Sequence, residues 1–231
     1  MKRIPASLND WKTFTNREIG AIGIGAMIVF IAMVLVAGIA ASVLIQTSGK
    51  LEMQAMKSGQ ETVAEVSSGI SVFDIVGKKG TDDLKYLAVT VRARAGAPNI
   101  DLNETIIILS DGTTKCVLLY HGWTEATHYN SSVDTDDGQL FGTGTWTDLT
   151  SEQFGIIVLQ DVDQSCLQTT PIINRGDKVV LTIRCDSGGA FGGEIPERTD
   201  VFGRVVPEVG SPGIISFTTP PAYNDGIFDL R

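Results

Sequence analysis

The stretch AIGIGAMIVFIAMVLVAGIAASVLI, residues Ala21–Ile45, decides the fold of this chain. No charged residue lies between Glu18 and Lys50. An apolar helix of about 20 residues is long enough to span the hydrocarbon of a bilayer. The stretch therefore predicts either a helix that anchors the chain in a membrane, or a helix that packs against copies of itself in the axis of a filament.

Charge restricts what the chain can bind and how it inserts. The 231 residues carry a net charge of −9, which argues against a nucleic-acid partner because such binding needs a basic face. The 20 residues that precede the apolar stretch hold four Lys or Arg against two acidic residues. Positive charge flanking an apolar span favours the cytoplasmic side, so we expect the N-terminus inside the cell and the C-terminal domain outside.

The leader, residues 1–20, differs from a secretory signal peptide. A secretory signal has an apolar core of about 7–15 residues followed by a cleavage site with small residues. Here the apolar core is longer, and the small residue Gly20 comes before it. Cleavage between Gly20 and Ala21 would make the apolar segment the new N-terminus. An uncleaved signal anchor is the alternative that the residues alone leave open.

Residues 21–68 are predicted to form one helix, about 70 Å long at 1.5 Å per residue. Small side chains let helix backbones approach closely where no hydrophobic effect drives them together, and four residues are assigned to such packing: Gly23, Gly25, Gly38 and Ala41. The second half of the helix carries an apolar stripe that includes Met56 and Val63. This pattern predicts an amphipathic extension that packs in part on the chain's own β domain.

Residues 69–231 are expected to form the outer domain. Apolar residues there alternate with polar ones, which is typical of β-strands. Predicted strands are 86–95, 105–109, 115–120, 154–160, 178–184, 201–206, 213–218 and 226–230. The dipeptide Asp111-Gly112 predicts a hairpin with a type I′ turn. The fold class is α+β: a long N-terminal hydrophobic helix followed by an antiparallel, Ig-like sandwich or barrel.

Two parts of the sequence resemble archaellins, the archaeal flagellins that build the archaellum filament. At the N-terminus these are Gly20–Gly25 and Ile28–Thr47, and near the C-terminus Val206–Gly210 and Phe217–Pro220. The resemblance implies a class III, type IV pilin-like precursor that a membrane peptidase related to prepilin peptidase cuts after Gly20. The leader is long for the family, and its residue before Gly20 is not the usual basic one. Bacterial type IV pilins usually carry glutamate at the fifth mature position, where this chain has Gly25.

The resemblance implies a structural role and no enzymatic activity. The expected protein is a subunit of a helical archaellum filament for swimming motility, built from this chain alone or together with other archaellins. The precursor would wait in the cytoplasmic membrane, and its partners would be the peptidase and the archaellum assembly machinery. The alternatives are an adhesive type IV pilin and a monomeric, membrane-anchored extracellular domain that binds a ligand.

The outer domain holds candidate modification and cation sites. Asn103, at the start of a strand, and Asn130, in a polar loop, lie in N-glycosylation sequons, and the resemblance implies that both can carry N-linked glycans. Two aspartate pairs, Asp134 with Asp136 and Asp161 with Asp163, are spaced like ligands of a calcium loop. Both loops lack other parts of that pattern, so simple solvated turns are favoured over divalent-cation sites, and no other cofactor is expected.

The cysteines and histidines predict no catalytic or metal centre. Three widely spaced cysteines, Cys116, Cys166 and Cys185, are expected to be buried and structural rather than paired in a disulfide. His121 and His128 are expected in a surface loop or at an interface.

Overall fold

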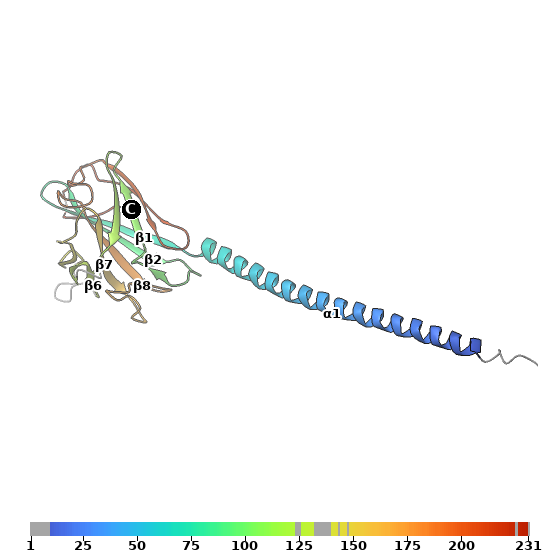
Figure 1. The fold of residues 1–231 in the computed structure, drawn as a ribbon. Helices are drawn as coiled ribbons and strands as arrows, with labels where there is room; N and C mark the ends of the chain where they lie inside the picture. Colours follow the sequence, from blue (N-terminus) through green and yellow to red (C-terminus); the bar gives the residue numbers. More distant parts are fainter. Residues whose placement is uncertain are drawn as a thin grey trace, which may run out of the picture. The chain divides into compact units, whose positions relative to one another are not determined.

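The computed structural model describes residues 10–122, 126–131, 140–142, 144–146, 148–224 and 226–230. The chain divides into two compact units, residues 1–59 and 60–231. One helix, α1 (Asp10–Ser67), makes up the described part of the first unit and ends in the second (Figure 1). No proline interrupts this sequence, so every backbone N–H of the helix interior can donate to the carbonyl four residues before it.

Twelve strands follow α1 in the described residues. They are β1 (Ile70–Lys79), β2 (Leu84–Ala93), β3 (Ile100–Asp101), β4 (Ile106–Ser110), β5 (Lys115–Tyr120), β6 (Tyr129–Asn130), β7 (Gln153–Gln160), β8 (Ile172–Ile173), β9 (Lys178–Arg184), β10 (Asp200–Val206), β11 (Gly213–Thr218) and β12 (Ile227–Asp229). Two short 3₁₀ helices, Ala126–His128 and Gly144–Trp146, lie between β5 and β7.

Ten of these strands form one curled, mostly antiparallel sheet. The strand order is β11-β10-β4-β5-β7-β9-β2-β1-β12, with β6 beside β7, while β3 and β8 pair separately. A short parallel pairing between β5 and β7 joins two antiparallel halves. Strands β1 and β11 come into contact although they lie near opposite ends of this order, so the sheet curls back on itself. The prediction of a long apolar helix followed by an antiparallel β domain is confirmed. The two layers of the predicted sandwich are parts of one continuous, curled sheet.

The core lies inside the curl, where side chains from both halves meet. Leu87, Val89 and Val91 of β2 are fully buried there, as are Leu118 of β5 and Ile215 of β11. A second cluster covers the other face of the central strands β2, β9 and β7, and its members are Ala88, Phe141, Trp146, Ile157 and Val180. Consecutive residues of these central strands are therefore buried, one on each face of the sheet. Their sequences for this reason lack the two-residue period of an antiparallel strand with one exposed face.

The β4–β5 hairpin differs from the predicted type I′ turn. Ser110 pairs with Lys115, which leaves a loop of four residues, and only Gly112 in that loop has a positive φ, +88°. A type I′ turn needs positive φ at both central residues. Asp111 keeps a negative φ because its carboxylate accepts hydrogen bonds from the backbone N–H groups of Thr113 and Thr114, at 2.8 and 2.6 Å.

Backbone contacts fix the end of α1 to the C-terminal part of the β domain. The N–H of Ser211 donates to the carbonyl of Ser68 at 2.9 Å, and the N–H of Ile70 donates to the carbonyl of Ser211 at 3.2 Å. Gly69, with φ +137°, lies so close that an added Cβ would stand 2.2 Å from the Ser211 carbonyl oxygen. Only glycine fits that position. The segment that resembles the archaellin C-terminal pattern thus leads directly into the contact that holds the helix exit.

Candidate functional site

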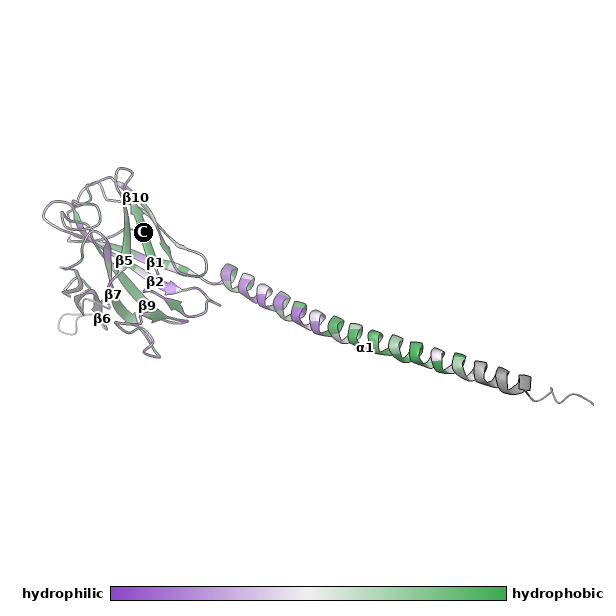
Figure 2. Ribbon diagram, viewed as in Figure 1, coloured by the Kyte–Doolittle hydropathy of each residue, from purple (hydrophilic) through white to green (hydrophobic). Residues whose placement is uncertain are grey.

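The segment of α1 from Ala21 to Ile45 carries a continuous apolar surface. The helix from Gly20 to Ser67 contains a window long and apolar enough to cross a membrane. Figure 2 shows the apolar segment mostly in green and the part of the helix that follows it mostly in purple and white. Fifteen large apolar side chains are more than half exposed: Ile22, Ile24, Met27, Ile28, Val29, Phe30, Ile31, Met33, Val34, Leu35, Val36, Ile39, Val43, Leu44 and Ile45. Such a surface requires cover from lipid or from another protein.

The glycines of this helix have no explanation within the chain. An added Cβ at Gly23, Gly25 or Gly38 would meet no atom within 4 Å. Each glycine nevertheless costs about 1 kcal/mol in a helix interior relative to alanine. Ala41 is likewise small and exposed. The reason for these small residues must lie outside this chain, and a close approach of another helix supplies one.

The amphipathic part of α1 is not covered in the way that its sequence predicts. Val63 and Val66, which belong to the same compact unit as the β domain, are 66% and 74% exposed. The expectation that the domain covers this stripe is therefore wrong for these residues. The contacts that fix the helix exit begin only at Ser68, where the chain is buried.

The predicted cleavage site lies within α1. The helix runs through Gly20 and Ala21 without interruption, and both residues are exposed. Among the described residues, and apart from the helix's own neighbouring backbone, no atom lies within 4 Å of a Cβ built on Gly20.

The structure brings three carboxylates together at the loop after β7. Ligand oxygens of Asp161, Asp163 and Asp177 lie within 4.8 Å of one another. Asp161 also accepts hydrogen bonds from the N–H groups of Ser165 and Cys166, at 3.2 and 3.0 Å. These bonds hold the loop closed around the aspartates. Asp177 lies directly before β9, where no local spacing pattern links it to the predicted pair, so the sequence did not reveal it.

Asp177 is the residue that makes this cluster fit a cation. Its side chain is buried, and one carboxylate oxygen, Oδ1, has no hydrogen-bond partner among the described residues. Burial raises the pKa of Asp177, and the charges of Asp161 and Asp163 raise it further. Calcium binds oxygen at about 2.3–2.6 Å, so carboxylate oxygens less than about 5 Å apart can share one ion. The other predicted pair, Asp134 and Asp136, lies outside the described residues.

The two sequons lie in different settings from those predicted. Asn103 is in a turn before β4, and the hydroxyl of Thr105, the third sequon residue, is buried and donates to the carbonyl of Asp101 at 3.0 Å. Asn130 is in β6 rather than in a loop, because it pairs with Ile157 of β7. Both asparagines are half-buried.

The three cysteines are buried and unpaired, as predicted. Burial raises the pKa of Cys116 to about 11 and that of Cys166 to about 12. These thiols are therefore poor nucleophiles in the folded domain. The surface position predicted for His128 is wrong: it is 1% exposed, and it lies directly before β6, which pairs with β7.

The fold and the helix surface together define a class. The chain combines an exposed apolar N-terminal helix that contains small residues with a C-terminal antiparallel β domain. This architecture is typical of type IV pilin-like filament subunits.

The comparisons narrow this class to one family. The model of the archaeal-type flagellins matches residues 20–217. Flagellin B2 of Methanocaldococcus jannaschii is 46% identical, covering 91% of this chain and 93% of that protein, and flagellin B3 of Thermococcus kodakarensis is 38% identical, covering 92% and 97%. The chain belongs to the archaeal-type flagellin family.

Solved structures share the fold. The crystal structure of archaeal flagellin FlaB1 from M. jannaschii matches with a TM-score of 0.62 and 28% identity, covering 71% of this chain and 96% of that chain. The archaeal flagellum of Methanospirillum hungatei strain JF1 matches with a TM-score of 0.58 over 89% of this chain and 98% of that chain, at 17% identity, a likeness of fold.

Proposed function

We propose that this protein is a structural subunit of an archaellum filament, which serves swimming motility outside the cell. The observation that carries this function is the apolar segment Ala21–Ile45 of α1, with fifteen large side chains exposed. Burying a large apolar side chain is worth about 1.5 kcal/mol or more, so keeping this surface from water is worth on the order of 20 kcal/mol. A subunit with this helix must be covered by lipid or by other subunits at every stage.

The helix has two successive surroundings in this proposal. The precursor holds residues 1–20 in the cytoplasm and spans the membrane with its apolar segment. A membrane peptidase related to prepilin peptidase cuts between Gly20 and Ala21, and the assembly machinery then moves the helix into the filament. Leaving lipid for a bundle of helices gains little from the hydrophobic effect, so close packing at Gly23, Gly25, Gly38 and Ala41 supplies the association.

The test combines processing, assembly and motility in cells that produce only this archaellin. Gly20→Val should abolish the mass loss of the leader and the filaments seen by electron microscopy, because the peptidase must bind the chain closely at the cut. Gly49→Val is the matched control, and it should be cut normally because it lies 29 residues from the bond. Normal filaments from Gly20→Val would contradict the cleavage site. Filaments without swimming would favour an adhesive pilin, and an uncut monomer a membrane-anchored binding domain.

We also propose that Asp161, Asp163 and Asp177 hold a divalent cation, with calcium as the ion that their oxygen ligands favour. The buried, unpartnered oxygen of Asp177 supports this site. The cation would fix the loop after β7 to the start of β9. We propose in addition that Asn103 and Asn130 carry N-linked glycans. Glycopeptide mass spectrometry of shed filaments tests both positions.

A further inference from the structure

The β domain carries a cationic pocket at the end from which α1 enters. The pocket has a volume of about 350 Å³, and four cations line it: Arg92, Arg94, Arg175 and Lys178. Residues 69–231 contain 12 Lys and Arg against 22 Asp and Glu, so one-third of the domain's cations gather at this place in an acidic domain.

These cations are available to a partner. Arg92, Arg94 and Arg175 are exposed. None of the four forms an ion pair within the described part of the chain. Arg92 and Lys178 lie over the ring of Phe73, at 5.3 and 5.8 Å from its centroid, which orients them without neutralising their charge. The one acidic residue of the lining, Asp177, has a buried side chain.

The opposite end of the same strands carries acidic side chains. Four carboxylates lie around the β1–β2 turn and the segment before β10: Asp82, Asp83, Glu194 and Glu197. Glu194 accepts a hydrogen bond from the N–H of Asp83 at 3.2 Å. Burial raises the pKa of Asp83, and the other three carboxylates add to this increase. The four side chains therefore form an acidic cluster at this end of the domain.

Three cations near this acidic cluster have partners within the domain. Lys85 and Arg184 both pair with Asp186, at 3.4 and 2.6 Å. The ammonium of Lys79 donates to the carbonyl of Tyr223 at 3.0 Å, and its charge opposes part of the rise in the pKa of Asp83. Arg198 is exposed and offsets one of the four carboxylates.

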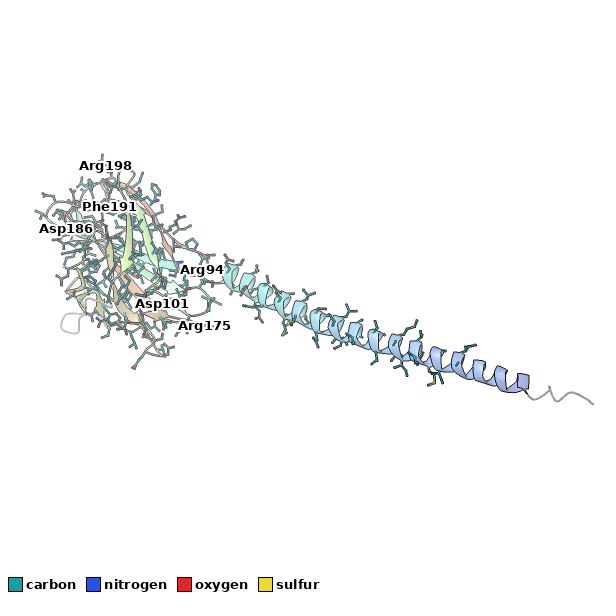
Figure 3. The ribbon with its side chains drawn as sticks, in the orientation of Figure 1. Arg94, Asp101, Arg175, Asp186, Phe191 and Arg198 are labelled. Carbon is teal, nitrogen blue, oxygen red and sulfur yellow. The ribbon has the colours of Figure 1, made fainter. Side chains whose placement is uncertain are left out.

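The two ends are separated by the length of the β1–β2 hairpin. The pocket contains Ser71, Arg92 and Ala93, where β1 begins and β2 ends, whereas the acidic side chains flank the turn between Lys79 and Leu84. Ten residues of strand at about 3.3 Å each place the ends about 30 Å apart. Figure 3 shows Arg94 and Arg175 at one end of the domain and Asp186 and Arg198 at the other.

We propose that β domains of successive copies associate head to tail, with the cationic pocket of one copy receiving the acidic end of the next. This inference rests on the proposed filament. Equivalent subunits in a helical filament are joined by contacts between two different surfaces of the molecule. Complementary patches at opposite ends of one domain meet that condition, and attraction between them offsets the repulsion among acidic subunits.

The distance along α1 favours a second copy over a lipid headgroup. The apolar run ends near Ile45, and the helix continues to Ser67. These 22 residues of helix extend about 33 Å at 1.5 Å per residue. Because this segment separates the apolar run from the β domain, the pocket need not lie at the membrane surface. In a filament, by contrast, the β domain that carries the pocket always has neighbouring copies.

The experiment is a charge reversal with rescue in the full chain, in cells that produce only this archaellin. Arg175→Glu should lower the yield of filaments per cell at least tenfold, and Glu197→Lys alone should do the same. The double variant Arg175→Glu with Glu197→Lys should restore the yield to within about twofold of the wild type. Lys115→Glu is the control, because Lys115 is an exposed cation of β5 outside both patches, and it should leave the yield unchanged.

The controls separate folding and the proposed function from this contact. Each variant must accumulate as a processed subunit, which mass spectrometry of the cell membrane measures. A wild-type chain that forms no filaments would refute the proposed function itself. Unchanged filaments from Arg175→Glu, or loss that Glu197→Lys does not rescue, would overturn the head-to-tail contact. Rescue by Glu65→Lys instead would also overturn it, and would assign the pocket to the helix of a neighbour.

Discussion

Gly38 provides a sharp test, because the same substitution should have opposite effects before and after assembly. In the separate chain, a Cβ at Gly38 meets no atom within 4 Å. Gly38→Ala should therefore stabilise the helix of the subunit by about 1 kcal/mol through helix propensity alone. If Gly38 allows a close helix–helix approach, the same methyl group overpacks that contact, at a cost of about 1–3 kcal/mol.

The net effect in the filament should be a loss. The helix is formed both in the free subunit and in the filament, so its gain in stability does not offset the overpacking, and a cost of about 1–3 kcal/mol weakens association about 5- to 150-fold. Circular dichroism of the purified subunit in detergent should show equal or greater helicity for Gly38→Ala than for the wild type. Light scattering of shed filaments during heating should show that they dissociate at a lower temperature.

Gly59→Ala is the matched control for Gly38→Ala. Gly59 is also a helical glycine with no atom within 4 Å of an added Cβ, and it lies outside the residues assigned to close packing. It should stabilise the helix without weakening the filament. If filaments of Gly38→Ala are as heat-stable as those of Gly59→Ala, the packing role of Gly38 is refuted.

Three further predictions concern the β domain. Calcium at about 100 times its dissociation constant should stabilise the folded protein by about 2.7 kcal/mol, which raises Tm by about 5–10 °C for a domain of this size. Asp177→Asn should lose this increase in Tm. Without cation at neutral pH it should melt no lower than the wild type, since burial raises the pKa of Asp177 and its ionised form opposes folding. A calcium effect retained in Asp177→Asn would refute the site. Gly69→Ala should lower the free energy of unfolding by more than about 2 kcal/mol in urea titrations, because its Cβ would clash with the Ser211 carbonyl and its φ is positive. The control is Gly112→Ala, which has a positive φ but open space around the added Cβ, and it should cost about 1 kcal/mol. Equal losses in the two variants would show that the clash is unimportant. The three buried cysteines should resist a maleimide at pH 8 in the folded protein and react in urea, and rapid labelling without denaturant would contradict their burial.

The long helix and most strands were predictable because their patterns are local. The charge-free run fixes α1, and alternation or apolar runs identify β2, β4, β5, β7 and β9 to within about two residues. Strand β1 was missed because its sequence ISVFDIVGKK places Asp74 and Gly77 among its apolar residues. Its register with β2 and β12 supplies the stability that its local pattern does not indicate.

The sites were less predictable because they depend on contacts between distant segments. Asp161 and Asp163 were found from their spacing, but Asp177 joins them only through the packing of β9 beside β7. The burial of His128 similarly depends on its place beside β7 rather than on its neighbours in sequence. The type I′ turn failed because the Asp111 carboxylate binds the backbone N–H groups of its own loop, a competing interaction that the Asp-Gly pattern does not distinguish.

The N-terminal residue of the protein in shed filaments tests the central claim most directly. The helix can pass from lipid to a bundle of its own copies only if the charged leader is first removed. Intact-mass measurement and N-terminal peptide sequencing of purified filaments should find Ala21 as the first residue. A filament protein that retains Met1 or Lys2 would contradict the account.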